Sequence, residues 1–106
     1  MKVSIIIAVN NSAGTIERAI KSIRKQSYKD IEIIFINNNS SDNSLNIINQ
    51  NTNKGDIVVS EPDNGLYNAI NKGIKISSGD IIGVLHSDDF YPHKSVISEY
   101  IELFKQ

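Results

Sequence analysis

The sequence predicts an α/β fold in which a mostly parallel sheet of about four strands carries helices on both faces. Four short apolar runs, rich in β-branched residues, each precede a stretch with helical spacing of apolar residues. Such alternation is typical of parallel sheets with right-handed crossovers, whose strands are apolar on both faces. We expect the strand order 3-2-1-4, with a ligand crevice where the order reverses, beside strands 1 and 4.

Composition limits the function. The 106 residues allow one domain, 1–106, with a modest core. A net charge of −1 makes nucleic acid a poor candidate partner, and the lack of cysteine excludes disulfides and thiolate metal sites. No apolar run approaches the roughly 18 residues of a membrane span. We expect a cytoplasmic protein, which at full length can lie at the inner face of the membrane.

The first predicted unit is the apolar strand Val3–Val9 with the helix that follows it. Turn-forming residues separate the two, and either Ser12 or Thr15 can cap the helix. Its apolar face consists of Ile16, Ala19, Ile20 and Ile23.

Two further strands are predicted at Ile31–Ile36 and Ile57–Ser60. Between them, a polar loop leads into a short helix at Asn43–Gln50, which starts at Ser41 or Asp42.

Two more helices follow. The first runs from Leu66 to about Ile76, with an apolar stripe of Leu66, Ala69, Ile70 and Ile74. The second has Pro92 in its first turn. Its stripe is most simply core and consists of Val96, Ile97, Tyr100, Ile101 and Phe104.

The fourth strand, Ile81–Leu85, leads to two adjacent carboxylates, Asp88 and Asp89. Its length and flanks predict a buried strand. Carboxylates beyond the carboxyl end of such a strand are suited to Mg²⁺ with substrate phosphates. Taken alone, the pair is better explained as a solvated turn in which Asp89 helps to cap the next helix. Because Asn10 and Asn37-Asn38 follow strands 1 and 2, all three loops are expected at one mouth, where amides can recognise a base.

Four segments resemble the family 2 glycosyltransferases, especially the bacterial surface-polysaccharide branch. They are residues 3–12, 37–42, 60–73 and 79–89. The resemblance covers essentially the whole chain and implies the nucleotide-binding half of a Rossmann-like GT-A fold, as the N-terminal portion of a longer glycosyltransferase.

The resemblance implies inverting transfer of a sugar from a nucleotide donor, often a UDP-sugar, to the hydroxyl of a carbohydrate or lipid-linked acceptor, with Mg²⁺ or Mn²⁺. Asp88 matches the family's metal ligand and Asp89 is its neighbour. His86 replaces the usual first residue of that motif, and we expect a hydrogen-bonded loop role for it. The implied nucleotide-binding residues are Ala8, Val9, Asn10, Asn37, Asn38, Asp63, Asn68 and Ser87.

Departures from the family pattern keep an alternative open. The family's base-contacting Asp is Asn37 here, so that bond is no longer charge-assisted, and its helix Asp is Asn68. We expect the catalytic base beyond Gln106, so the chain is either a donor-binding portion or a non-catalytic nucleotide-binding module. We expect no sugar transfer by the isolated chain, and self-association through the uncovered strand at Ile81–Leu85 or the last helical stripe.

Overall fold

A four-stranded parallel sheet forms the centre of the fold. The computed structural model describes residues 1–62 and 65–105. In chain order the elements are β1 (Val3–Val9), α1 (Ile16–Arg24), β2 (Ile31–Asn37), α2 (Ser44–Asn51), β3 (Ile57–Ser60), α3 (Leu66–Ile76), β4 (Ile81–Val84) and α4 (Val96–Phe104). The order β3-β2-β1-β4, with every pair parallel, confirms the predicted topology.

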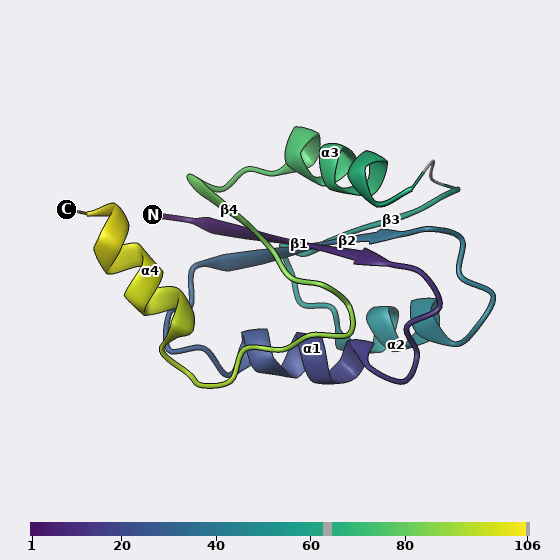
Figure 1. The fold of residues 1–106 in the computed structure, drawn as a ribbon, viewed down its shortest axis with the longest axis horizontal. Helices are drawn as coiled ribbons and strands as arrows, with labels where there is room; N and C mark the ends of the chain where they lie inside the picture. The colour runs from purple at the N-terminus through teal and green to yellow at the C-terminus, as the bar shows by residue number, and fades with distance from the viewer. Residues whose placement is uncertain (63–64, 106) are drawn as a thin grey trace.

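Helices lie on both faces of the sheet, as predicted. Figure 1 shows α3 over one face, α1 and α2 over the other, and α4 beside the end of the sheet where the chain begins. Because side chains alternate along a strand, β1 contributes to two cores. Ile5 and Ile7 belong to the larger core, with α1, α2 and α4, whereas Ile6 packs with Ala69 under α3.

Helix α1 follows the predicted pattern, and all four apolar residues of its stripe are buried. Thr15 occupies the position before the helix, but neither Thr15 nor Ser12 caps it through a side chain. Instead, the Ser12 carbonyl accepts the N–H groups of Thr15 and Ile16.

Helix α3 meets the sheet through small residues, which corrects the predicted stripe. Ala69 and Gly73 are buried, whereas Leu66 and Ile74 are 45% and 44% exposed. A Cβ on Gly73 would lie 2.7 Å from Ile6 Cγ2, so this glycine permits the close approach of α3 to β1.

Strand β4 lies at the edge of the sheet, as the predicted strand order requires. The prediction that this strand is buried was wrong. Ile82 and Val84 are 41% and 43% exposed, because β4 pairs only with β1 and α3 covers β1 and β2 instead. The strand ends at Val84, and Leu85 is buried just beyond it.

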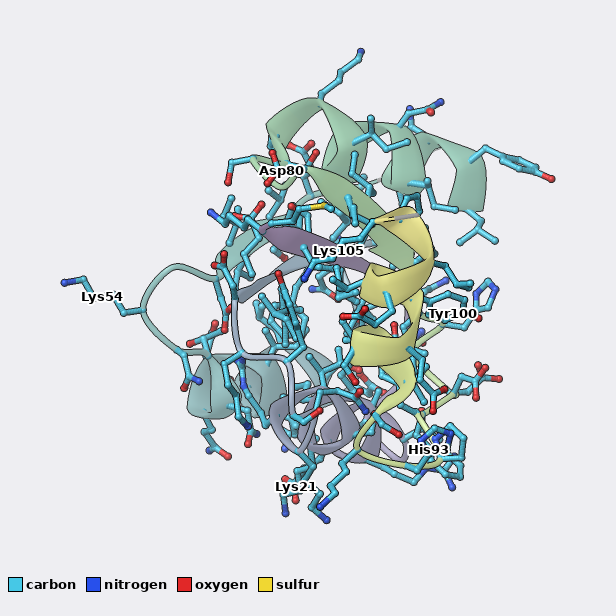
Figure 2. All side chains as sticks on the ribbon, turned by 90° about the vertical axis from the view of Figure 1, so that its left-hand side faces the viewer. Lys21, Lys54, Asp80, His93, Tyr100 and Lys105 are labelled. Atoms are coloured by element: carbon cyan, nitrogen blue, oxygen red, sulfur yellow. The ribbon has the colours of Figure 1, made fainter. Side chains whose placement is uncertain are left out.

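Helix α4 begins later than predicted and buries only part of its stripe. Pro92 lies in the preceding loop, because the carbonyls of His93 and Lys94 accept the Gln26 side-chain amide and the Ser27 N–H. Gln26 Oε1 accepts the N–H of Ile97, in the first turn of α4, at 3.0 Å. The predicted burial of the stripe is confirmed for Ile97 and Ile101. It was wrong for Tyr100 (Figure 2) and Phe104, which are exposed.

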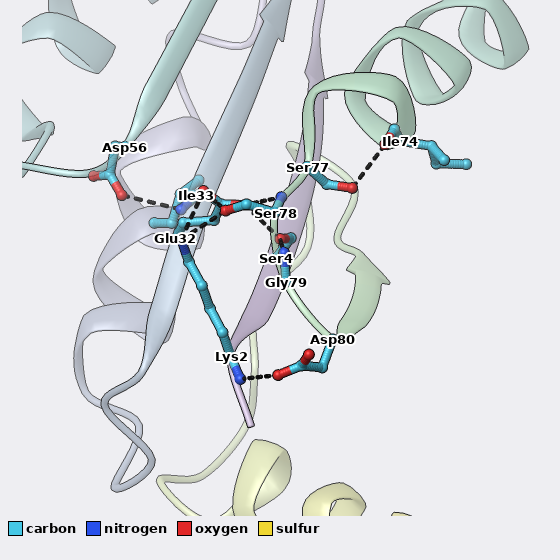
Figure 3. Close-up of polar contacts among 10 residues, drawn as sticks. All are labelled: Lys2, Ser4, Glu32, Ile33, Asp56, Ile74, Ser77, Ser78, Gly79 and Asp80. Carbon is cyan, nitrogen blue, oxygen red and sulfur yellow. Dashed lines mark hydrogen bonds and ion pairs between the residues drawn. The ribbon is translucent and has the colours of Figure 1, made fainter.

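At the amino ends of the strands, a buried glutamate joins β1, β2 and the segment before β4 (Figure 3). Glu32 is 4% exposed and accepts the hydroxyl of Ser4 at 2.5 Å and the N–H of Ser78 at 2.8 Å. Lys2 Nζ lies 3.4 Å from the other oxygen of Glu32. In the part of the chain that is described, no helix has the length and hydropathy needed to cross a membrane.

Candidate functional site

A pocket of about 560 Å³ opens at the carboxyl ends of β1, β2 and β4 and at the start of α3. Parallel α/β sheets bind ligands at this end of their strands. Its lining consists of Ala8, Val9, Asn10, Asn11, Ser12, Thr15, Ile36, Asn38, Gly65, Leu66, Ala69, His86, Ser87 and Asp88.

Two other hollows are at least as large but lie away from the strand ends. One, of about 610 Å³, lies between the end of α1 and residues 50–56, where Arg24 pairs with Asp56. The other, of about 650 Å³, lies between α1 and residues 90–94. We select the pocket at the strand ends because polar groups from three separate loops converge there.

The pocket collects six of the residues that were predicted to bind the nucleotide or the metal. They come from three segments far apart in the chain and are Ala8, Val9, Asn10, Asn38, Ser87 and Asp88. Asn37, Asn68 and Asp89 are not among the lining residues, and Asp63 lies outside the described residues. The predicted convergence of the three loops therefore exists, and the roles assigned to the individual residues stay predictions.

Asn37 does not line the pocket, although its two neighbours in the chain, Ile36 and Asn38, do. It is 1% exposed, its Nδ2 donates to Ser60 Oγ at 3.0 Å, and its Oδ1 accepts Ser40 Oγ at 2.6 Å. Both functions of its amide are thus used inside the protein. Asn38, whose N–H donates to the Val9 carbonyl at 2.8 Å, is the asparagine of the pair that reaches the pocket wall.

The two carboxylates after β4 have different surroundings. Asp88 is exposed and lines the pocket. Asp89 accepts the N–H of Phe90 at 2.8 Å, and its own N–H donates to the His86 carbonyl at 3.0 Å, which closes a turn. The expectation that Asp89 helps to cap the next helix was wrong, because α4 begins at Val96 with Ser95 at its N-cap. Asp89 takes part in the turn after β4 instead, and the metal role of the pair stays a prediction.

Among residues 1–62 and 65–105, no group of three or more His, Cys, Asp or Glu side chains could hold a metal by itself. Asp88 can supply one carboxylate, with His86 as its neighbour in the wall of the pocket. A divalent cation at this place would need phosphate oxygens and water for its remaining ligands, as Mg²⁺ usually does.

A polar framework fixes the loop after β1 against the loop after β2. Asn11, at φ 51°, uses its Oδ1 to accept the N–H of Ser41 at 2.8 Å and that of Asp42 at 3.3 Å. Asp42 accepts the hydroxyl of Ser44 at 2.5 Å, together with the backbone N–H groups of Ser44 and Ala13. These bonds, led by that of the Ser44 hydroxyl, lower the pKa of Asp42. Ser41 and Asp42 were both predicted as possible starts of α2. Of the two, Asp42 accepts the N–H of Ser44, the first residue of the helix, through its side chain.

Two contacts attach the Asp88 loop to the rest of the site. The hydroxyls of Ser12 and Ser87 are 2.7 Å apart, and Arg18 Nη2 donates to the Asp88 carbonyl at 3.1 Å. The Arg18 guanidinium also stacks over the ring of Phe90, 4.5 Å from its centroid. Sequence reasoning assigned Ser12 only a capping role and gave Arg18 none, since these contacts join residues 70 or more positions apart.

Comparison with known proteins places this geometry in a family. The sequence profile described as "Glycosyl transferase family 2" matches residues 4–106. An Escherichia coli protein named "UDP-Glc:alpha-D-GlcNAc-diphosphoundecaprenol beta-1,3-glucosyltransferase" is 38% identical over 92 residues, covering 84% of this chain and 36% of that protein. The chain spans about a third of the length of several such relatives.

Two of the solved structures that share the fold hold a nucleotide-sugar. S. aureus TarS 1–349, crystallised with UDP-GlcNAc, has a TM-score of 0.90 at 24% identity over 99% of this chain and 31% of its own. The mannosyltransferase PcManGT from Pyrobaculum calidifontis, crystallised with GDP-Man and Mn²⁺, has a TM-score of 0.90 at 18% identity over 99% of this chain and 32% of its own. Because the family profile spans nearly every residue, the chain belongs to glycosyl transferase family 2.

Proposed function

We propose that this chain binds the nucleotide-sugar donor of a glycosyltransferase, most simply a UDP-sugar. The observation that carries the proposal is the convergence of Asn10, Asn38 and Asp88 in one pocket. Support comes from TarS, whose structure holds UDP-GlcNAc, and from the E. coli relative, whose name specifies UDP-Glc.

The pocket offers the chemistry that a nucleoside diphosphate needs. The amide groups of Asn10 and Asn38 can donate to and accept from a base or ribose, whereas the Asn37 amide is bonded to Ser60 and Ser40. Leu66, which is 45% exposed, adds an apolar side chain to the wall that suits the flat face of a base.

Asp88 is the residue proposed to hold Mg²⁺ or Mn²⁺. Asp88 is exposed and lines the pocket. The donor diphosphate and water would supply the remaining ligands of the cation. When bound, the cation neutralises the charge of the diphosphate. PcManGT, with the same fold, was crystallised with Mn²⁺.

For the whole protein we propose inverting transfer to a carbohydrate or lipid-linked acceptor in bacterial polysaccharide synthesis. The E. coli relative, named for a diphosphoundecaprenol-linked acceptor, supports this substrate class. Inverting displacement needs a base that deprotonates the acceptor hydroxyl. We assign that role to no residue of this chain.

Calorimetric titration of UDP with Mn²⁺ tests the proposal. We expect the wild type to bind and a chelator to abolish binding. Asp88→Ala should weaken it by at least about tenfold, since it removes a charged metal ligand. The matched control is Asp80→Asn, at the opposite end of the same strand, where the carboxylate accepts the Lys2 N–H. Binding by Asp88→Ala that matches the control would contradict the metal assignment.

A further inference from the structure

We infer that Asp42 and Ser44, neither of which lines the pocket, are positioning residues that hold the Asp88 loop in place through Ser12. The inference rests on the proposed donor site, because it concerns the loop that would present the metal ligand. It assigns a role in ligand binding to residues that contact only other parts of the protein.

The relay begins at a buried serine with a defined hydrogen-bond direction. Ser44 is fully buried, and its hydroxyl donates to Asp42 Oδ1 at 2.5 Å. A hydroxyl has one proton, so its oxygen is left as an acceptor for a second partner. That partner is the backbone N–H of Ser12, which donates to Ser44 Oγ at 2.7 Å.

The second step fixes the Ser12 backbone. While its own N–H is held by Ser44, the next N–H, that of Ala13, donates to Asp42 Oδ2 at 3.1 Å. Both oxygens of Asp42 thus help to set the path of the loop after β1, one directly and one through Ser44. The direction in which the Ser12 side chain leaves the backbone follows from that path.

The third step reaches the candidate metal ligand. Ser12 Oγ lies 2.7 Å from the Oγ of Ser87, the residue directly before Asp88. Beyond β4, the segment from His86 to Asp89 is held to the rest of the protein by this bond and by the one from Arg18 to the Asp88 carbonyl. A change at Ser44, on α2, can therefore move or loosen a carboxylate in another loop.

The fold supplies a matched control at the other end of the sheet. Like Ser44, Ser4 is fully buried, donates to a carboxylate at 2.5 Å (Glu32) and accepts a backbone N–H (Gly79, at 2.8 Å). Ser44→Ala and Ser4→Ala thus delete the same chemical group from equivalent surroundings. Of the two, only Ser44 is joined to the Asp88 loop by the side-chain hydrogen bonds described.

Amide hydrogen exchange of residues 86–89 in the ligand-free chain, together with UDP titration in Mn²⁺, tests the relay. We expect Ser44→Ala to speed exchange at these amides and to weaken UDP binding by about 3- to 10-fold, the effect of one lost hydrogen bond. Ser4→Ala should lower the denaturation midpoint and leave both readouts as in the wild type.

The Ser12→Ala variant covers the case in which Ser44→Ala fails to fold, and a double-mutant cycle of the two completes the test. Ser12→Ala, at a half-buried position, removes only the last link and should also speed exchange at residues 86–89. The effects of Ser12→Ala and Ser44→Ala should not add, because both variants interrupt the same series of hydrogen bonds. Unchanged exchange in Ser12→Ala, or additive effects in the double mutant, would overturn the relay. A wild type that binds no UDP would refute the proposed function, whereas the exchange data would still decide the relay.

Discussion

The two ends of the sheet use polar side chains in opposite ways. At the amino end, the carboxylate of Glu32 is buried and surrounded by donors from Ser4, Ser78 and Lys2. At the carboxyl end, the carboxylate of Asp88 is exposed in the wall of a pocket. A buried, satisfied carboxylate stabilises a fold, whereas an exposed one at a strand end is available to a ligand.

A second buried carboxylate at the amino end strengthens the contrast. The side chain of Asp56 is 2% exposed, accepts the N–H groups of Ile33 and Asn53, and pairs with Arg24. Substitutions at this end should therefore change the free energy of unfolding, and substitutions at the other end should change affinity.

The largest expected effect is that of Glu32→Ala. The substitution leaves the Ser4 hydroxyl and the Ser78 N–H without their acceptor at a buried position. We expect the free energy of unfolding to fall by about 3 kcal/mol, measured by urea denaturation. UDP affinity of the folded fraction should equal that of the wild type. Weaker UDP binding by the folded fraction of Glu32→Ala would contradict the assignment of stability to the amino end and of binding to the carboxyl end.

Acid pH offers a second way to sharpen the comparison. Burial raises the pKa of Glu32, but hydrogen bonds from Ser4 and Ser78 and the charge of Lys2 outweigh it, so the pKa lies below its ordinary value of 4.5. A lowered folded-state pKa means that the ionised form stabilises the fold. This contribution is fully present above the unfolded-state pKa and is lost as pH falls through the folded-state pKa.

We therefore expect the difference in free energy of unfolding between wild type and Glu32→Gln to be constant near neutrality and to shrink in acid. Urea denaturation between neutral pH and the acid limit of folding measures it. A gap of the same size at all pH values would show that the charge of Glu32 contributes nothing.

Local sequence patterns predicted the elements of the fold. Strands at Val3–Val9 and Ile57–Ser60 and the stripe of α1 were correct, because runs of β-branched residues and helical spacing are local properties. The exposed faces of β4 and α3 were not foreseen, since burial depends on which elements lie above a strand and not on its own apolarity.

Contacts between residues far apart in the sequence were beyond that reasoning. Gln26 fixes the start of α4 from 71 positions away, and Ser12 meets Ser87 across 75. Such pairs leave no periodic signal. One signal was present: Glu32 is the only charged residue of β2, and a charge in a largely apolar strand usually has partners in the fold.

The smallest expected effect concerns Arg18, which belongs to the carboxyl end although it lies on the exposed side of α1. It holds the Asp88 carbonyl and stacks on Phe90, so Arg18→Ala should loosen the loop that carries the candidate metal ligand. We expect UDP affinity in Mn²⁺ to fall by about two- to threefold, with a change in unfolding free energy below about 0.5 kcal/mol. The control is Lys21→Ala, an exposed cation on the same helix that pairs only with Glu17 among the ion pairs described. Equal affinity in the two variants would show that the Asp88 loop keeps its place without Arg18, and that the bond between Ser12 and Ser87 suffices to hold it.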